Sequence, residues 1–116
     1  SYHAGLWSLD IFKSLDVFDT VVCYDGAEFN VKDMPVVVGE LGNGGPVTEG
    51  AMFEFRKAQE EGTKQIKNAL FIKTTDFARP AELSPCPTHG HHWFANAESY
   101  FLIGDAAGEG MKSLLK

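Results

Sequence analysis

The chain has 116 residues, which is enough for a single domain with one hydrophobic core. Apolar residues make up 44% of the sequence, a share that is ordinary for a folded globular protein and argues against a disordered chain. Sixteen acidic residues against ten lysines and arginines give a net charge of −6, which argues against a nucleic-acid partner, and no apolar run is long enough to span a membrane.

The beginning of the chain predicts a helix followed by a strand. Apolar residues recur at roughly helical spacing over residues 4–15, so a helix is expected there. Residues 17–24 are rich in β-branched and aromatic side chains and end at the turn signal Asp25-Gly26, which indicates a strand. The first residues lack the charged and apolar regions of a signal peptide, and this observation leaves the localisation open.

A strand, a helix and another strand are predicted next, over residues 34–40, 51–67 and 69–74. Three consecutive valines in the first of these segments indicate a strand buried on both faces, as parallel strands are. The predicted inner face of the helix holds Phe55, Ala58, Gln59, Gly62 and Ile66. Its predicted solvated face holds Glu54, Arg56, Lys57, Glu60 and Lys64.

A proline-rich loop over residues 75–95 precedes the last predicted helix, for which Asn96 is a favourable N-cap. The predicted inner face of that helix holds Ala97, Tyr100, Phe101, Gly104, Ala107, Gly108, Met111 and Leu115. The element order predicts one α/β layered domain over residues 1–116 with a mainly parallel sheet. Three strands would leave a sheet edge exposed, so a homo-oligomer is expected.

The glycine-rich segment 39–45 follows the valine-rich strand. Ligands of open α/β sheets bind beyond the carboxyl ends of the strands, and Gly42 lets a ligand approach the main chain there. Glu40 and Asn43 would add a carboxylate and an amide. A glycine-rich turn that leads into the helix explains the same pattern, and on the pattern alone this structural interpretation is favoured.

Three of the four histidines lie within four positions of the loop before the last helix, at His89, His91 and His92. Imidazole is suited to proton transfer near neutral pH, and together with Cys86 it is also a zinc ligand. However, the side chains of adjacent residues such as His91 and His92 are expected to point in different directions, so no metal site is predicted. A solvated histidine loop remains the simple alternative. Cys23 and Cys86 are expected to be free thiols.

Three sequence blocks together resemble one known family. They are residues 35–42 (Pro-Val-Val-Val-Gly-Glu-Leu-Gly), residues 55–59 (Phe-Arg-Lys-Ala-Gln), and Gly-His-His-Trp at 90–93 followed by residues 96–106. In this order and spacing they resemble the sialate O-acetylesterase-like domain of carbohydrate esterases. The resemblance runs from about Asn30 to the C-terminus, whereas residues 1–29 match the family poorly.

The resemblance implies a three-layer flavodoxin-like (SGNH-hydrolase) fold, of which this chain carries an incomplete, C-terminal part. It implies an acetylated carbohydrate as substrate and hydrolysis of the acetyl ester without cofactor or metal. The catalytic histidine of the family lies in the loop before the last helix, which corresponds to His92, with His91 as second candidate. Proteins of this family are often secreted or periplasmic.

Two departures from the family pattern bear on activity. The family's nucleophilic serine lies in a Gly-Gln-Ser-Asn sequence that is absent here, so the isolated chain is expected to be inactive. The family also has an acid three residues before the catalytic histidine, where this sequence has His89, or Thr88 if His91 is the base. A noncatalytic sugar-binding or interaction module and a small metal-binding protein therefore remain alternatives.

Overall fold

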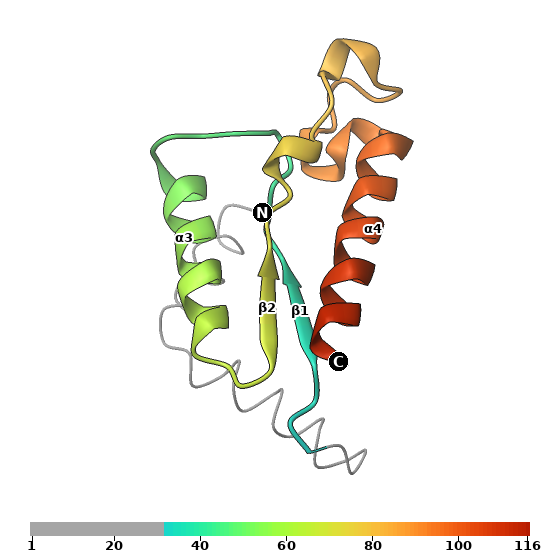
Figure 1. Ribbon diagram of the computed structural model, residues 1–116. Helices are drawn as coiled ribbons and strands as arrows, with labels where there is room; N and C mark the ends of the chain where they lie inside the picture. Colours follow the sequence, from blue (N-terminus) through green and yellow to red (C-terminus); the bar gives the residue numbers. More distant parts are fainter. Residues whose placement is uncertain (1–31) are drawn as a thin grey trace.

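The computed structural model describes residues 32–116 and shows a small α/β fold (Figure 1). Its main elements are β1 (Val36–Gly39), α3 (Ala51–Lys64), β2 (Ala69–Ile72) and α4 (Ala97–Leu114). Three short 3₁₀ segments lie between β2 and α4: η1 (Thr75–Phe77), η2 (Ala81–Leu83) and η3 (Gly90–Ala95). The helix and strand predicted over residues 4–15 and 17–24 lie outside the described residues.

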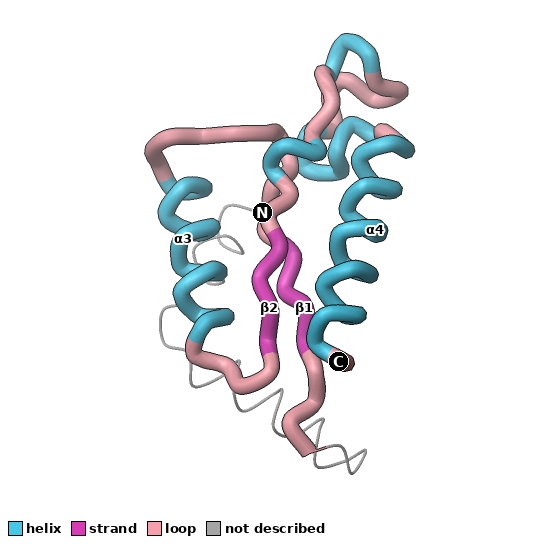
Figure 2. The backbone as a smooth tube through the Cα atoms, viewed as in Figure 1, coloured by secondary structure: helices cyan, strands magenta, loops and turns pink. Residues whose placement is uncertain are grey.

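The two strands pair in parallel, with Val36 opposite Ala69 and Gly39 opposite Ile72. Parallel neighbours need a crossover connection, and α3 supplies it. Figure 2 shows the sheet between the two helices, with α3 on one side and α4 on the other. The predicted parallel α/β arrangement is confirmed in this form, although both strands and α3 end one to three residues earlier than the sequence predicts.

The described core is small and centres on the contact between α3 and the sheet. Its buried apolar side chains are those of Val38, Phe55 and Ile66. Arg56 of α3 is only 6% exposed, so its predicted place on the solvated face of the helix is wrong. The charge of Arg56 was the reason to predict a solvent-exposed position. Its hydrogen bonds to the loop after β1 hold the side chain inside the protein instead.

Helix α4 packs on the sheet through a face other than the predicted one. A Cβ atom at Gly110 would lie 3.0 Å from Leu70 and 3.4 Å from Ile72, so the helix backbone rests directly on the strands. Ser99 is fully buried on the same side, whereas Phe101 is 72% exposed. The prediction failed because α4 carries small and apolar residues on both of its faces, so its periodicity does not orient it.

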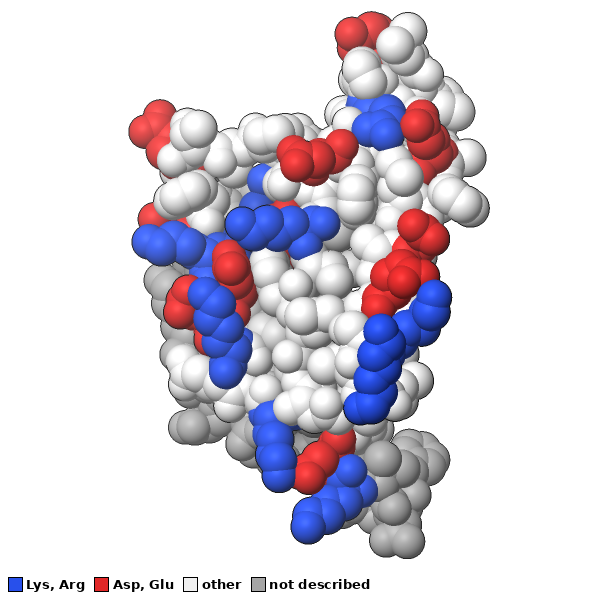
Figure 3. Space-filling view, in the orientation of Figure 1, with Lys and Arg blue, Asp and Glu red and all other residues white. Residues whose placement is uncertain are grey.

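Charged side chains are interspersed over the visible surface. Figure 3 shows acidic and basic residues along α3 and α4, on either side of an uncharged surface over the strands. On this face the negative net charge of the chain is therefore not gathered into one acidic patch.

Candidate functional site

The glycine-rich loop after β1 is held by one arginine of α3. Arg56 Nε donates to the carbonyl oxygen of Leu41 at 2.6 Å, and its two terminal nitrogens donate to the carbonyl oxygens of Gly45 at 2.9 Å and Asn43 at 3.1 Å. Burial lowers the pKa of the Arg56 guanidinium, and the nearby Glu40 carboxylate offsets part of that shift. The glycines of this loop would make its backbone flexible, and the planar guanidinium of Arg56 fixes its conformation.

Gln59, one helical turn after Arg56, forms hydrogen bonds with the backbone at the beginning of the same loop. Its side-chain Oε1 accepts from the backbone N–H of Leu41 at 2.8 Å, and its Nε2 donates to the carbonyl oxygen of Gly39 at 3.3 Å. The blocks 39–45 and 55–59 therefore form one structural unit. This pairing has a physical basis, because the arginine and glutamine side chains satisfy the backbone groups of the loop.

Gly42 lies against the backbone that follows β2. A Cβ atom there would lie 2.6 Å from the backbone nitrogen of Thr75 and 2.7 Å from the carbonyl carbon of Thr74. Gly42 is buried, so the structure places it in a close backbone contact and not on an open ligand surface. The buried Oδ1 atom of Asn43 has no hydrogen-bond partner among the described residues.

Glu40 joins the carboxyl ends of the two strands. Its Oε1 accepts from the backbone N–H groups of Thr74 at 3.0 Å and Thr75 at 2.9 Å, and its own carbonyl oxygen accepts from Thr74 Oγ1 at 2.7 Å. The carboxylate therefore satisfies two free backbone N–H groups at the start of η1. One oxygen of this predicted substrate-binding residue is thus engaged in holding the fold.

The start of α4 is tied to this edge of the sheet. Ser99 Oγ donates to the carbonyl oxygen of Phe77 in η1 at 2.7 Å. Asn96 Oδ1 accepts from the backbone N–H of Ser99 at 3.2 Å, which confirms the predicted N-cap, and its Nδ2 donates to Ser84 Oγ at 3.0 Å. Hydrogen bonds thus link the ends of both strands to the loop that carries the histidines.

The backbone of that loop takes an unusual conformation. Three consecutive residues, Trp93, Phe94 and Ala95, have φ angles of 54°, 54° and 55°, in the left-handed region that side chains with a Cβ atom disfavour. The His92 N–H donates to the carbonyl oxygen of His89 at 3.0 Å, and the His92 carbonyl oxygen accepts from Tyr100 Oη at 2.7 Å. The loop is therefore held in a strained shape from both sides.

The three imidazoles lie side by side on the surface. The ring centroids of His91 and His92 are 4.3 Å apart, and those of His89 and His91 are 5.7 Å apart. The expectation that His91 and His92 point in different directions is therefore wrong, because their rings lie against each other. Within residues 32–116 no group of three or more histidine, cysteine, aspartate or glutamate side chains is placed to hold a metal ion. Cys86 is a free thiol.

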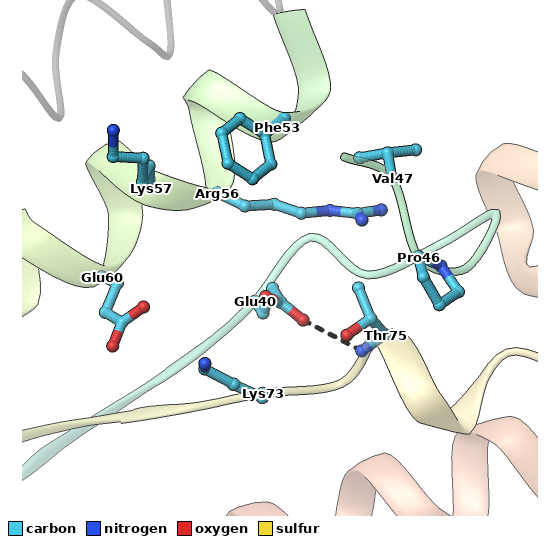
Figure 4. A pocket seen from close by; sticks show the side chains of 9 residues that line it. All are labelled: Glu40, Pro46, Val47, Phe53, Arg56, Lys57, Glu60, Lys73 and Thr75. Atoms are coloured by element: carbon cyan, nitrogen blue, oxygen red, sulfur yellow. Dashed lines mark hydrogen bonds between the residues drawn. The ribbon is translucent and has the colours of Figure 1, made fainter. Parts of the chain in front are cut away.

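A pocket of about 200 Å³ lies on the α3 side of the same edge (Figure 4). It is lined by Glu40, Pro46, Val47, Phe53, Arg56, Lys57, Glu60, Lys73 and Thr75. Figure 4 shows basic and acidic side chains on its wall together, so its charge favours neither an anion nor a cation. Lys57 Nζ lies 5.9 Å from the Phe53 ring centroid, within reach of a cation–π contact.

The predicted site residues therefore fall into two groups, one around the loop after β1 and the other in the histidine loop before α4. Glu40 lines the pocket, while Gly42 and Asn43 belong to the braced loop beside it and the histidines lie toward α4. The structure does not bring these groups into one described cavity. Sequence reasoning missed Arg56 and Gln59 as the residues that hold the loop, and their spacing of one helical turn was the available signal.

No helix in the described part of the chain is both long and apolar enough to cross a membrane. Searches against protein-family models, curated proteins and solved structures returned no match for this chain.

Proposed function

We propose that this chain carries the C-terminal part of a carbohydrate acetylesterase domain with a three-layer flavodoxin-like fold, in which His92 is the general base. The observation that carries the proposal is the strained loop around His92. Three left-handed residues follow this histidine directly, and its N–H and carbonyl groups are both hydrogen-bonded. Backbone strain of this kind concentrates at functional sites.

The position of the loop supports the same function. Parallel α/β sheets bind ligands beyond the carboxyl ends of their strands, and the loop is tied to that edge through Ser99 and η1. The His92 ring is exposed, so it is accessible to a substrate. His91 is exposed as well, but the backbone hydrogen bonds just described fix His92 from both sides, which favours His92 as the base.

The nucleophile of this proposal comes from outside the described residues. The serine hydroxyls of residues 32–116 all donate to backbone carbonyl oxygens: Ser84 to Pro80, Ser99 to Phe77 and Ser113 to Gly110. A serine from elsewhere would attack the acetyl carbonyl carbon while His92 takes its proton. The proton then passes to the departing sugar hydroxyl, and water releases acetate from the acetyl-serine by the same route.

The proposal can be tested on the chain as it is, without catalysis. The imidazole signals of the histidines are followed by NMR while an O-acetylated methyl glycoside is added at millimolar concentration. The His92 signals should shift, whereas the deacetylated glycoside should shift them much less. His92→Ala should abolish the response of the remaining rings, and His91→Ala should leave the His92 response in place. Equal shifts with both glycosides would instead support the noncatalytic sugar-binding alternative.

Catalysis by the isolated chain gives a second test. Without its nucleophile the chain should hydrolyse p-nitrophenyl acetate no faster than free imidazole at the same histidine concentration. A fluorophosphonate probe should label no serine stoichiometrically. Labelling of one serine would contradict the need for a nucleophile from elsewhere. If neither glycoside shifts any imidazole signal in the NMR experiment, the esterase proposal itself is contradicted.

A further inference from the structure

The loop after β1 contains an asparagine directly before a glycine, at Asn43 and Gly44. The backbone N–H of Gly45 donates to the carbonyl oxygen of Gly42 at 3.0 Å, so Asn43 and Gly44 are the two central residues of a β-turn. The φ angle of Gly44 is 84° and that of Asn43 is not positive, which identifies a type II turn. Gly44 is exposed, and a Cβ atom there would meet nothing within 4 Å. No other part of the described chain therefore obstructs the peptide bond that follows Asn43.

The side-chain amide of Asn43 differs from the two other asparagine amides of residues 32–116. Asn68 Nδ2 donates to the carbonyl oxygen of Asp33 at 2.7 Å, and Asn96 uses both ends of its amide in the hydrogen bonds at the start of α4. The Oδ1 atom of Asn43 is buried without a hydrogen-bond partner among the described residues. Hydrogen bonds therefore hold the amides of Asn68 and Asn96 in place, whereas the amide oxygen of Asn43 is not held in this way.

We infer that Asn43 is a site of spontaneous deamidation and that Arg56 controls its rate. The deprotonated backbone nitrogen of Gly44 attacks Cγ of Asn43, and the new C–N bond closes a five-membered succinimide ring. The bond from Cγ to Nδ2 breaks, and the proton lost from Gly44 ends on the departing nitrogen, which leaves as ammonia. Water then adds to one of the two ring carbonyl carbons and opens the ring, which gives aspartate or isoaspartate. Water is the only co-reactant of this sequence.

Ring closure requires a backbone rotation that Arg56 opposes. The nitrogen of Gly44 must come round to the side of the Asn43 Cβ atom, but in a type II turn the ψ angle of the first central residue is about +120°, which turns these two atoms away from each other. The rotation also swings the carbonyl oxygen of Asn43, to which Arg56 donates at 3.1 Å. The other bonds of Arg56, to the carbonyl oxygens of Leu41 and Gly45, hold the backbone on either side. Deamidation therefore proceeds through a locally opened loop.

The product changes the loop in which it forms. Deamidation adds a negative charge to a chain whose net charge is already −6. Isoaspartate also adds a methylene group to the main chain inside the turn, so the bond between Gly45 and Gly42 and the bonds of Arg56 lose their present geometry. The loop after β1 is therefore expected to loosen as the protein ages. This inference does not depend on the proposed function.

The site is tested by incubating the full 116-residue chain in mildly alkaline buffer, digesting samples at intervals and following the fragments by mass spectrometry. The fragment with Asn43 should gain the mass difference between an amide and an acid, whereas those with Asn68 and Asn96 should not. The same chain unfolded in guanidinium chloride gives the rate without the turn, and the folded chain should react more slowly by on the order of tenfold or more. No gain in mass at Asn43 of the folded chain over many half-lives of the unfolded chain would overturn the site. Equal rates in the two states would overturn its control by the turn.

Substitutions separate the role of Arg56 from a general loss of stability. Arg56→Met should raise the rate at Asn43 on the order of tenfold, because the loop opens more often without its hydrogen bonds. Gly110→Val is the matched destabilised control, since its side chain would collide with the strands beneath α4 and not with the loop. Its rate should stay within about threefold of the parent rate. Asn43→Gln should show no gain in mass at this position, because closure would need a six-membered ring. An Arg56→Met variant that deamidates at the parent rate, or a Gly110→Val variant that is accelerated as much, would refute control by Arg56.

Discussion

Arg56 and Leu41 are joined by a 2.6 Å hydrogen bond from Nε to the carbonyl oxygen, and this contact begins a set of three that encloses the guanidinium in the glycine-rich loop. Each bond pairs a buried charge with a backbone acceptor that the loop itself does not satisfy. Arg56 is therefore a structural residue at the carboxyl edge, the edge of the sheet where the carboxyl ends of both strands lie. From the residue type alone, an arginine would be expected on the surface.

Replacement of Arg56 by methionine should destabilise the protein by about 2–4 kcal/mol, because one buried and two partly buried carbonyl oxygens lose their donors. Arg56→Lys should recover only a minor part of that loss, since an ammonium cannot reproduce the planar fork. The neighbouring exposed Lys57→Met is the matched control and should change stability by no more than about 0.5 kcal/mol. Urea unfolding measures all three, and an unaffected midpoint for Arg56→Met would contradict the bracing role.

Gly42→Ala should destabilise the protein by about 1–3 kcal/mol, because its methyl group would collide with the backbone of Thr74 and Thr75. Gly39→Ala serves as control, since a Cβ atom there meets nothing within 4 Å. It should be neutral within about 0.5 kcal/mol. Thermal unfolding of the two variants gives the comparison, and equal effects would argue against the close contact at Gly42.

Ala95→Gly should stabilise the protein by about 0.5–1 kcal/mol, because glycine accepts the left-handed conformation at this position without a Cβ penalty. The same substitution at Ala107, in the right-handed interior of α4, should destabilise it by about 1 kcal/mol. Chemical denaturation should show changes of opposite sign in the free energy of unfolding of the two variants. A loss of stability with Ala95→Gly would mean that this residue is not held in the left-handed region.

The ion pair between Arg79 and Glu98 should make stability depend on pH. The Arg79 hydrogen bond and charge lower the pKa of Glu98 below its ordinary value. The pair therefore stabilises the fold above the unfolded-state pKa of the carboxyl group, and this contribution is lost as the pH falls through the lowered folded-state pKa.

Arg79→Gln should raise the pKa of Glu98 toward its ordinary value, and a carboxyl-carbon NMR titration measures the shift. Its cost to stability should be present at neutral pH and absent in acid below the folded-state pKa. Lys112→Gln, which removes a partner of Glu109 on the same helix, should leave the Glu98 titration unchanged. An unaltered Glu98 pKa in the Arg79 variant would exclude the pairing as its cause.

The sequence predicted those features that depend on local patterns. Asn96 was identified as an N-cap because an amide side chain before a helix has a well-defined partner, and the valine run identified β1. The role of Arg56 was not predictable in this way, because it depends on carbonyl oxygens 11 to 15 positions away in a loop. The face of α4 that packs on the sheet could not be predicted from the spacing of apolar residues either, since such residues line both faces of the helix. For the candidate site, the sequence located the histidine loop but predicted neither the contact between its rings nor the left-handed turn that follows His92.

The link between Glu40 and Thr74 has a consequence for how the chain folds. The two residues are 34 positions apart, so their hydrogen bonds form only after the whole β1–α3–β2 segment has closed into a loop. Loop closure costs conformational entropy before any strand pairing compensates for it. We therefore expect α3 and α4 to gain helical structure early and the carboxyl edge to assemble late, as the rate-limiting event. The hydrogen bonds that shape the histidine loop, such as the one from Tyr100 to His92 eight positions away, are local and would form before the contacts of Glu40 with Thr74.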